Sequence, residues 1–416
     1  MRLAETIAVS GSKHPTRREF LGGLSTAAAL SLMQACRGSG KQEEGSPTDQ
    51  ASKPQVTGSG ATIRWSKAIC KEPDNYPAWP TIARTAEGDL LVVFSGDREE
   101  HVCPYGKTEM IRSQDRGVTW SMPKIINSTP LDDRDAGLIV LQSGTLVVSW
   151  FTVKTWEKLD YYRGMKRWAD HQIDGWERHC RKLSEETRQR WLGNWTRRST
   201  NGGQTWEPAV DSIASAPHGP IQLQDSRLLY VGTAELEGSP AIVCSSSDDE
   251  ARSWRQIGSL PVSEEDLEKY GFTEPHIAEV AKDEIYCILR THHLSIGYNY
   301  ASRSLDGGRT WSNPEATPLY GYDQPGHLLI LNDGRLLCTY GRRAEPFGCR
   351  ACISEDGGRT WPMDQEIILR DDAPNTDMGY PATAEIEPRE LLTVYYQIAQ
   401  PGEKVSIHAT RWSLAT

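Results

Sequence analysis

The octapeptide SEDGGRTW at residues 354–361 recurs almost unchanged at residues 304–311 as SLDGGRTW. Three more copies of the pattern Ser-x-Asp-x-Gly-x-Thr-Trp come earlier: SQDRGVTW (113–120), STNGGQTW (199–206) and SDDEARSW (247–254). An Asp or Asn side chain can accept hydrogen bonds from backbone N–H groups two residues on, and glycine tolerates the positive φ of a tight turn. The Trp would then pack the turn against a sheet. We therefore expect five structural turns whose Asp residues have no catalytic role.

A longer repeating unit surrounds these turns. Pairs of strand-like apolar runs, such as the one ending in LLVVF (90–94), occur six times along the chain. With the octapeptide and a following strand, each unit has four antiparallel strands in about fifty residues, which is typical of a β-propeller blade. The sixth unit lacks the octapeptide, and the early strand TIRWSKAI (62–69) could complete it and close the ring. The predicted fold is all-β, a six-bladed β-propeller spanning residues 61–416.

One segment interrupts this pattern in blade two. Residues 155–193 are rich in charge, contain no proline, and place Trp, Leu and Tyr at spacings of three and four. That spacing is typical of an amphipathic helix. We expect a helical insertion between the second and third strands of blade two.

The N-terminal residues 1–36 read as an export signal. Arg17 and Arg18 precede a short apolar run at residues 21–33, as in a twin-arginine signal, and Cys36 then lies where a lipoprotein signal is cleaved. Residues 37–60 contain no aromatic residue and read as a flexible linker. We expect an exported protein, periplasmic or extracellular, whose one link to a membrane is a lipid on Cys36.

Net charge and cysteine content indicate which partners and bound groups to expect. A net charge of -10 gives no basic surface for nucleic acid, so we expect no nucleic-acid partner. Eight of the nine cysteines follow Cys36, and their closest pair, Cys349 and Cys352, has no matching pair elsewhere. Most lie in apolar runs, so we expect buried thiols, no bound metal and no cofactor.

Propeller geometry brings polar side chains to one central mouth. In antiparallel blades, the starts of the first strands and the ends of the second strands lie on the same face. The first strands begin near Trp79, Asp135 (after Arg134), His218, Glu274 with His276, His327 and Tyr380. The second strands end near Arg98, Arg290 with His292 and His293, and Arg342 with Arg343. We expect this face to bind substrate and the insertion to cover it. A metal-dependent enzyme using Asp135 and the histidines His218, His276 and His327 is an alternative.

The five octapeptides resemble the Asp-box, or BNR, repeats of the sialidase superfamily, and the resemblance, to an exported bacterial member, covers residues 61–416. It implies that Tyr380 is the nucleophile, Glu274 its base, and Arg290 and Arg343, with Arg342 as the rival, the groups that bind a substrate carboxylate. The family's first arginine is replaced by Ala78. Its acid has no obvious match in GDREEH (96–101), where Asp97, Glu99, Glu100 and His101 are candidates.

These residues suit the chemistry that the resemblance implies. Arginine forks match a carboxylate with two parallel hydrogen bonds. A neutral Tyr avoids the repulsion that an anionic nucleophile meets at a carboxylated anomeric carbon, and sialidases are a known exception to the use of two carboxylates by glycosidases. The expected function is an exo-acting hydrolase that removes a terminal acidic sugar from glycans, with sialic acid first. The alternatives are a non-catalytic carbohydrate-binding propeller and a glycosidase or lyase for another uronate-like sugar.

Overall fold

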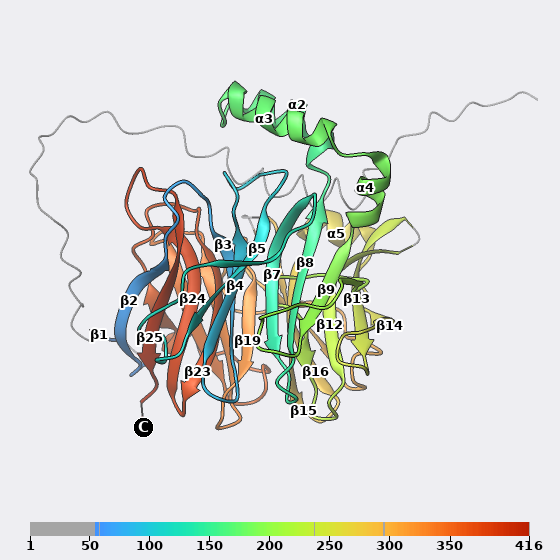
Figure 1. The fold of residues 1–416 in the computed structure, drawn as a ribbon. Coiled ribbons are helices and arrows are strands. Elements are labelled where there is room, and N and C mark those ends of the chain that lie inside the picture. Colours follow the sequence, from blue (N-terminus) through green and yellow to red (C-terminus); the bar gives the residue numbers. More distant parts are fainter. Residues whose placement is uncertain (1–54, 58, 237, 294–295, 416) are drawn as a thin grey trace, which may run out of the picture.

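Residues 55–57, 59–236, 238–293 and 296–415 are described by a computed structural model of the chain. They form six antiparallel sheets around a common axis (Figure 1). Blade one contains β3 (Ala78–Arg84), β4 (Leu90–Gly96), β5 (Lys107–Ser113) and β6 (Lys124–Asn127). Blade two contains β7 (Asp132–Val140), β8 (Leu146–Val153), β9 (Asn194–Ser199) and β10 (Val210–Asp211). Blade three contains β11 (Ile221–Gln222), β12 (Leu228–Leu236), β13 (Ser239–Ser247) and β14 (Arg255–Ser259).

The second half of the ring repeats this order. Blade four contains β15 (Thr273–Ala281), β16 (Glu284–Arg290), β17 (Tyr300–Ser304) and β18 (Glu315–Ala316). Blade five contains β19 (Gly326–Ile330), β20 (Leu336–Arg342), β21 (Gly348–Ser354) and β22 (Ile367–Arg370). A short helix, α5 (Glu264–Tyr270), precedes blade four, and a 3-10 turn, η2 (Met363–Gln365), precedes β22. The six-bladed propeller predicted from the repeats is confirmed.

The ring is closed by strands from both ends of the chain. Blade six contains β23 (Gly379–Glu387), β24 (Glu390–Ile398) and β25 (Val405–Ser413), and β2 (Thr62–Cys70) pairs antiparallel with β25. This is the closure predicted for TIRWSKAI. A further edge strand, β1 (Gln55–Val56), pairs with β2, so two residues of the predicted linker join this sheet. The rest of the linker up to residue 54 and the predicted signal, with Arg17, Arg18 and Cys36, lie outside the described residues.

Apolar side chains between neighbouring blades form the core. Between blades six and one, for example, Val92 and Phe94 of β4 pack with Leu392 and Val394 of β24, all four fully buried. The eight cysteines in the described part of the chain are buried free thiols, as expected. None of the helices in this part has the length and hydrophobicity needed to cross a membrane.

The octapeptides are structural turns between the third and fourth strands of their blades. Asp356 accepts hydrogen bonds from the backbone N–H groups of Arg359 (3.0 Å) and Thr360 (2.9 Å) and from the Thr360 hydroxyl (2.7 Å). The Ser354 hydroxyl accepts a bond of 2.8 Å from the Gly358 N–H. The Asp thus bonds N–H groups three and four residues on, not two as the sequence suggested, because the loop is one wide turn closed by both Ser and Asp.

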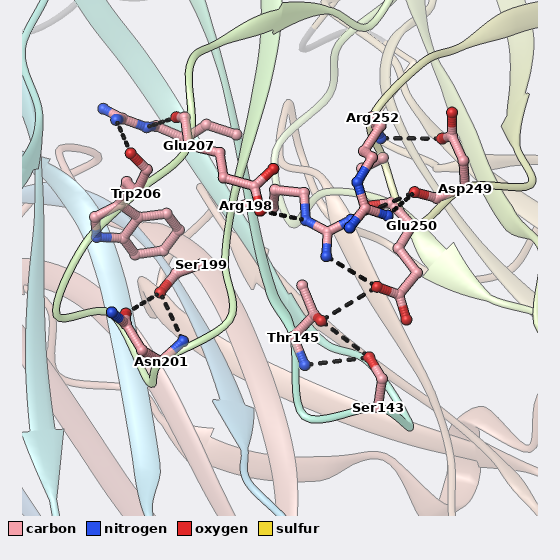
Figure 2. Close-up of polar contacts among 12 residues, drawn as sticks. Ser143, Thr145, Arg198, Ser199, Asn201, Trp206, Glu207, Asp249, Glu250 and Arg252 are labelled. Carbon is pink, nitrogen blue, oxygen red and sulfur yellow. Dashed lines mark hydrogen bonds and ion pairs between the residues drawn. The ribbon is translucent and has the colours of Figure 1, made fainter.

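Contacts between successive turns stabilise the face on which they lie. The buried guanidinium of Arg198, next to the turn of blade two, lies 3.0 Å from Glu250 in the turn of blade three and 3.3 Å from Glu207 (Figure 2). Glu250 also accepts a bond of 3.3 Å from Thr145 in the β7–β8 loop. In this third turn, Ala251 stands at the glycine position and keeps a positive φ of 66°. These interactions join blades two and three and leave the turn carboxylates occupied.

The insertion in blade two is helical, as predicted. Its segments are η1 (Thr155–Glu157), α2 (Leu159–Met165), α3 (Asp170–Arg181) and α4 (Glu185–Trp191). The insertion joins β8 to β9, and α2 and α3 lie beyond one end of the blades (Figure 1). Tyr162, Trp168, Ile173 and Trp176 pack with Val102 from blade one. The insertion is therefore fixed to the loop that follows β4.

Candidate active site

Backbone irregularities at the start of the first strands aim side chains at the propeller mouth. Trp79, Asp135, Glu274 and Tyr380 have positive φ values of 56°, 53°, 47° and 53°. At each of them the register between the first and second strands shifts. Positive φ is uncommon for residues other than glycine, and β-bulges next to active sites redirect side chains. A bulged residue with positive φ thus occurs at the same position in blades one, two, four and six, which indicates one common site.

The closest contacts at this mouth join Tyr380, Glu274 and Arg290. The Tyr380 hydroxyl donates to Glu274 Oε1 at 2.8 Å, and Arg290 Nη1 donates to Tyr380 Oη at 2.7 Å and to Glu274 Oε2 at 2.5 Å. Burial raises the pKa of Tyr380 well above its usual value, although the charge of Arg290 opposes this. The phenol is therefore protonated at neutral pH and faces a carboxylate that can take its proton.

Asp323, which precedes β19, holds two arginines in place. It accepts bonds from Arg290 Nε (3.0 Å) and Nη2 (2.7 Å) and from Arg343 Nη1 (3.3 Å), and its Oδ1 lies 3.0 Å from His292 Nδ1. Burial acts against the charged form of Asp323, but Arg290, His292 and Arg343 together lower its pKa below the usual value. Arg343 also donates to the carbonyl oxygens of Thr376 (3.0 Å) and Asp323 (3.1 Å).

Aromatic rings form the wall of the mouth on the side of blades one and six. The Trp79 ring lies 5.0 Å from His101, 5.9 Å from Tyr76 and 6.4 Å from Tyr380, measured between centroids. Two guanidinium groups lie against the same indole, that of Arg134 at 4.7 Å and that of Arg98 at 4.9 Å. Guanidinium groups are attracted to aromatic faces at such distances.

The Arg98 side chain is bonded to protein groups and has a structural role. Its fully buried side chain donates to the carbonyl oxygens of Glu100 (3.0 Å) and His101 (2.9 Å) and pairs with buried Asp132 at 3.1 Å. These bonds fix the loop that follows β4.

The acid candidates of that loop lie in different surroundings. Both carboxylate oxygens of Glu99 are occupied, one by the Tyr105 hydroxyl and the other by Trp176 Nε1 of the insertion at 2.8 Å. Glu100 pairs with Lys404 at 3.0 Å, and Asp97 pairs with Lys107. These three carboxylates hold neighbouring elements together.

His101 lies at the mouth, with its Nδ1 3.0 Å from the Tyr76 hydroxyl. Burial, together with the charges of Arg134 and Arg167, lowers the pKa of His101 well below its usual value. The ring is therefore neutral at neutral pH. A neutral imidazole is a weak acid for a leaving group.

Two other carboxyl groups face the mouth. Asp135 is 5% exposed, and its Oδ1 has no hydrogen-bond partner among the described residues. Burial, with Glu274 nearby, raises the pKa of Asp135 to about 7 against the opposing charge of Arg134. Asp377 accepts a bond from Tyr76, and burial raises its pKa. A carboxyl group that keeps its proton near neutral pH can act as a general acid.

The histidines from blades three, four and five pack together. The ring centroids of His218, His276 and His327 lie 4.7 to 5.5 Å apart, and all three are buried. Burial lowers the pKa of His276 to about 3, and His276 Nδ1 accepts a bond of 2.9 Å from the Leu328 N–H of blade five. Within the described residues, no group of three or more His, Cys, Asp or Glu side chains could hold a metal ion. The rings are best understood as packing between blades.

The structure therefore brings together most of the residues singled out from the sequence. Several candidates have structural partners instead. Glu99 and Glu100 hold neighbouring elements together, and the three histidines pack between blades. Arg342 ends β20, and His293 Nε2 lies 3.1 Å from the Glu268 carbonyl of α5. Sequence reasoning missed Asp323, Asp377 and Tyr76. A scan for acidic residues in the loops leading into β19 and β23 would have found the first two.

Known proteins give independent comparisons. Residues 181–388, half of the chain, match the family described as BNR repeat-like domain. Among curated protein sequences, none matches the chain. A solved structure of a protein of unknown function from Dyadobacter fermentans has a TM-score of 0.67 at 24% identity, covering 86% of this chain and 100% of the other.

Two other solved structures of similar fold have named activities. The Hadza microbial sialidase Hz136 has a TM-score of 0.61 at 15% identity, covering 85% of this chain and 69% of the other. An α-L-arabinofuranosidase, Arb93A from Fusarium graminearum, has a TM-score of 0.54 at 14% identity, covering 83% of this chain and 96% of the other. At these identities the likeness shows the fold alone. With five octapeptide turns, six blades and a family match that spans half of its length, the chain belongs to the BNR repeat-like domain family.

Proposed function

We propose that this protein is an exo-acting glycoside hydrolase of the BNR-propeller type that removes a terminal acidic sugar, with sialic acid the first choice. The observation that carries the proposal is the hydrogen bond from Tyr380 to Glu274, with Arg290 bonded to both. A phenol needs an adjacent base to attack at neutral pH, and Glu274 is such a base. The fold of the solved sialidases and of the arabinofuranosidase is consistent with this class of reaction.

The proposed reaction has two steps. In the first, the Tyr380 proton passes to Glu274 Oε1, the phenolate oxygen attacks the anomeric carbon, and the leaving oxygen takes a proton from Asp135. In the second, Asp135 takes a proton from water, and the hydroxide displaces Tyr380, which recovers its proton from Glu274. Arg290 Nη1 stabilises the phenolate because it already donates to Tyr380 Oη at 2.7 Å. Asp135 replaces Glu99, Glu100 and His101 as the proposed acid because it combines a raised pKa with an unpaired oxygen.

A non-catalytic binding propeller is the second candidate. In it, Tyr380 would only contact the sugar, and Glu274 would only pair with Arg290 at 2.5 Å. The purified protein should be tested with aryl glycosides of sialic acid, of uronic acids and of neutral sugars. Release of the aryl group that is abolished by Glu274→Gln supports the hydrolase. Binding of a sugar without release of any aryl group would support the binding propeller.

A further inference from the structure

Three of the four largely buried guanidinium groups at the mouth, those of Arg98, Arg290 and Arg343, are already bonded to protein partners, and the fourth is that of Arg134. Arg290 uses four of its five N–H donors on Asp323, Glu274 and Tyr380. The donors of Arg343 are directed at Thr376, Asp323 and Tyr396. Arg98 is bonded to Glu100, His101 and Asp132. None of these three presents a free two-pronged edge to a ligand.

Arg134 differs from the other three. Its guanidinium makes no hydrogen bond or ion pair with another residue in the described part of the chain, although the residue is only 9% exposed, and its Nε is buried without a partner. A buried guanidinium without acceptors is costly, so such a group calls for a ligand. The Trp79 ring at 4.7 Å holds the planar group in one orientation.

Arg134 also lies beside the proposed reaction centre. It immediately precedes the bulge at Asp135, in β7, and the register of β7 with β8 shifts between Arg134 and Gly137. Burial works against its charge, but the carboxyl groups of Asp132 and Asp135 and the Tyr380 phenol raise the pKa of Arg134. The guanidinium is therefore charged and within electrostatic range of Tyr380.

The ion pairs around the mouth leave one of these four guanidinium groups without a carboxylate. Arg98 pairs with Asp132 at 3.1 Å. Arg290 pairs with Glu274 and Asp323, and Arg343 pairs with Asp323. The unpaired guanidinium is that of Arg134. Two parallel N–H groups fit the two oxygens of a carboxylate.

We propose that Arg134 is the residue that recognises the carboxylate of an acidic sugar in this site, while Arg290 and Arg343 mainly hold the reaction centre in shape. The proposal rests on the proposed function, because it places a sugar at Tyr380. It also explains how the site can do without an arginine at Ala78: the guanidinium comes from blade two and reaches the neighbouring Trp79.

A binding experiment tests this inference separately from catalysis. Affinities of the full protein are measured by calorimetry for the methyl glycosides of N-acetylneuraminic acid and of glucuronic acid, and for the methyl esters of the same compounds. The esters remove the charge and keep the rest of the sugar. We expect at least one acid to bind about tenfold or more tightly than its ester, as a charge-assisted hydrogen-bond pair would give.

The variants then assign the preference to Arg134. Arg134→Gln should remove the preference for acid over ester, and Arg134→Lys, which keeps the charge and loses the fork, should keep only part of it. Arg190→Gln, at an exposed arginine 5.4 Å above the Trp191 ring in the insertion, should keep it whole. An unchanged preference in folded Arg134→Gln, or no preference in the parent, overturns the inference. Acid binding that depends on Arg134 without turnover would instead count against the hydrolase.

Discussion

Tyr380 and Glu274, 106 residues apart in the sequence, meet at a hydrogen bond of 2.8 Å between blades six and four. Both side chains start from bulged residues with positive φ, so the fold pays a conformational cost to place them together. Neither this hydrogen bond nor its cost is needed to close the propeller, because the pairing of β2 with β25 and the apolar packing between blades do that. The pair is therefore the centre from which the predictions start.

Changing Tyr380 to Phe should lower kcat for a substrate with a poor leaving group by orders of magnitude and leave Kd for the product sugar nearly unchanged. The ring remains, and only the hydroxyl that donates to Glu274 is removed. Tyr396→Phe is the matched control, since Tyr396 lies in the same aromatic cluster but its hydroxyl faces Arg343 at 3.4 Å. If the two variants are equally active, the hydroxyl of Tyr380 takes no part in the reaction.

Changing Asp135 to Asn should lower turnover of glycosides with poor leaving groups by about 10²- to 10⁴-fold, the usual contribution of a general acid. Aryl glycosides with acidic phenols should be much less affected. In the parent enzyme, Asp135 must be protonated to act, so kcat/KM should fall as pH rises through about 7, where its raised pKa lies. A variant that loses equal activity on all leaving groups would show that Asp135 acts in another way.

Changing Asp356 to Ala should lower Tm and leave activity per folded molecule intact. The variant loses the three bonds from Arg359 and Thr360, each of roughly 1 kcal/mol net. Glu355→Ala, at the exposed neighbouring position, is the control and should change Tm little. Normal Tm together with lost turnover would contradict the structural role of the turns.

The sequence was sufficient for the ring and its turns because each blade repeats the same local pattern. One octapeptide, such as that ending at Trp361, predicts a turn, and six strand pairs then fix the number of blades. The positions of Glu274 and Tyr380 at strand starts followed from the same register. These features depend on local sequence, and a local pattern that occurs several times can be distinguished from a chance match.

The parts that were missed depend on long-range contacts. Asp323 binds Arg290, 33 residues away, from an irregular loop that breaks the blade pattern. Glu99 accepts a hydrogen bond from Trp176, 77 residues away in the insertion. No sequence feature near Glu99 predicts this contact. That the Arg134 guanidinium has no hydrogen-bond or ion-pair partner can be recognised only when the contacts of the surrounding residues are known. Pairing of charges across blades is a property of the closed ring.

For the N-terminus we propose export through a twin-arginine signal and a lipid anchor on Cys36. Replacing Arg17 and Arg18 by Lys should leave precursor in the cytoplasm, and Cys36→Ala should release the protein from the membrane fraction. Cell fractionation followed by immunoblotting measures both. Parent-like localisation of both variants would contradict this proposal.

The most direct test of the catalytic centre is to trap the sugar on the enzyme. A fluorinated glycosyl fluoride of the sugar that the aryl glycoside screen identifies would slow the second step, and peptide mass spectrometry would then locate the covalent label. We predict one sugar per molecule, attached to Tyr380 and absent from Tyr380→Phe. A label on any other residue, Glu274 included, would contradict the assignment of Tyr380 as the nucleophile.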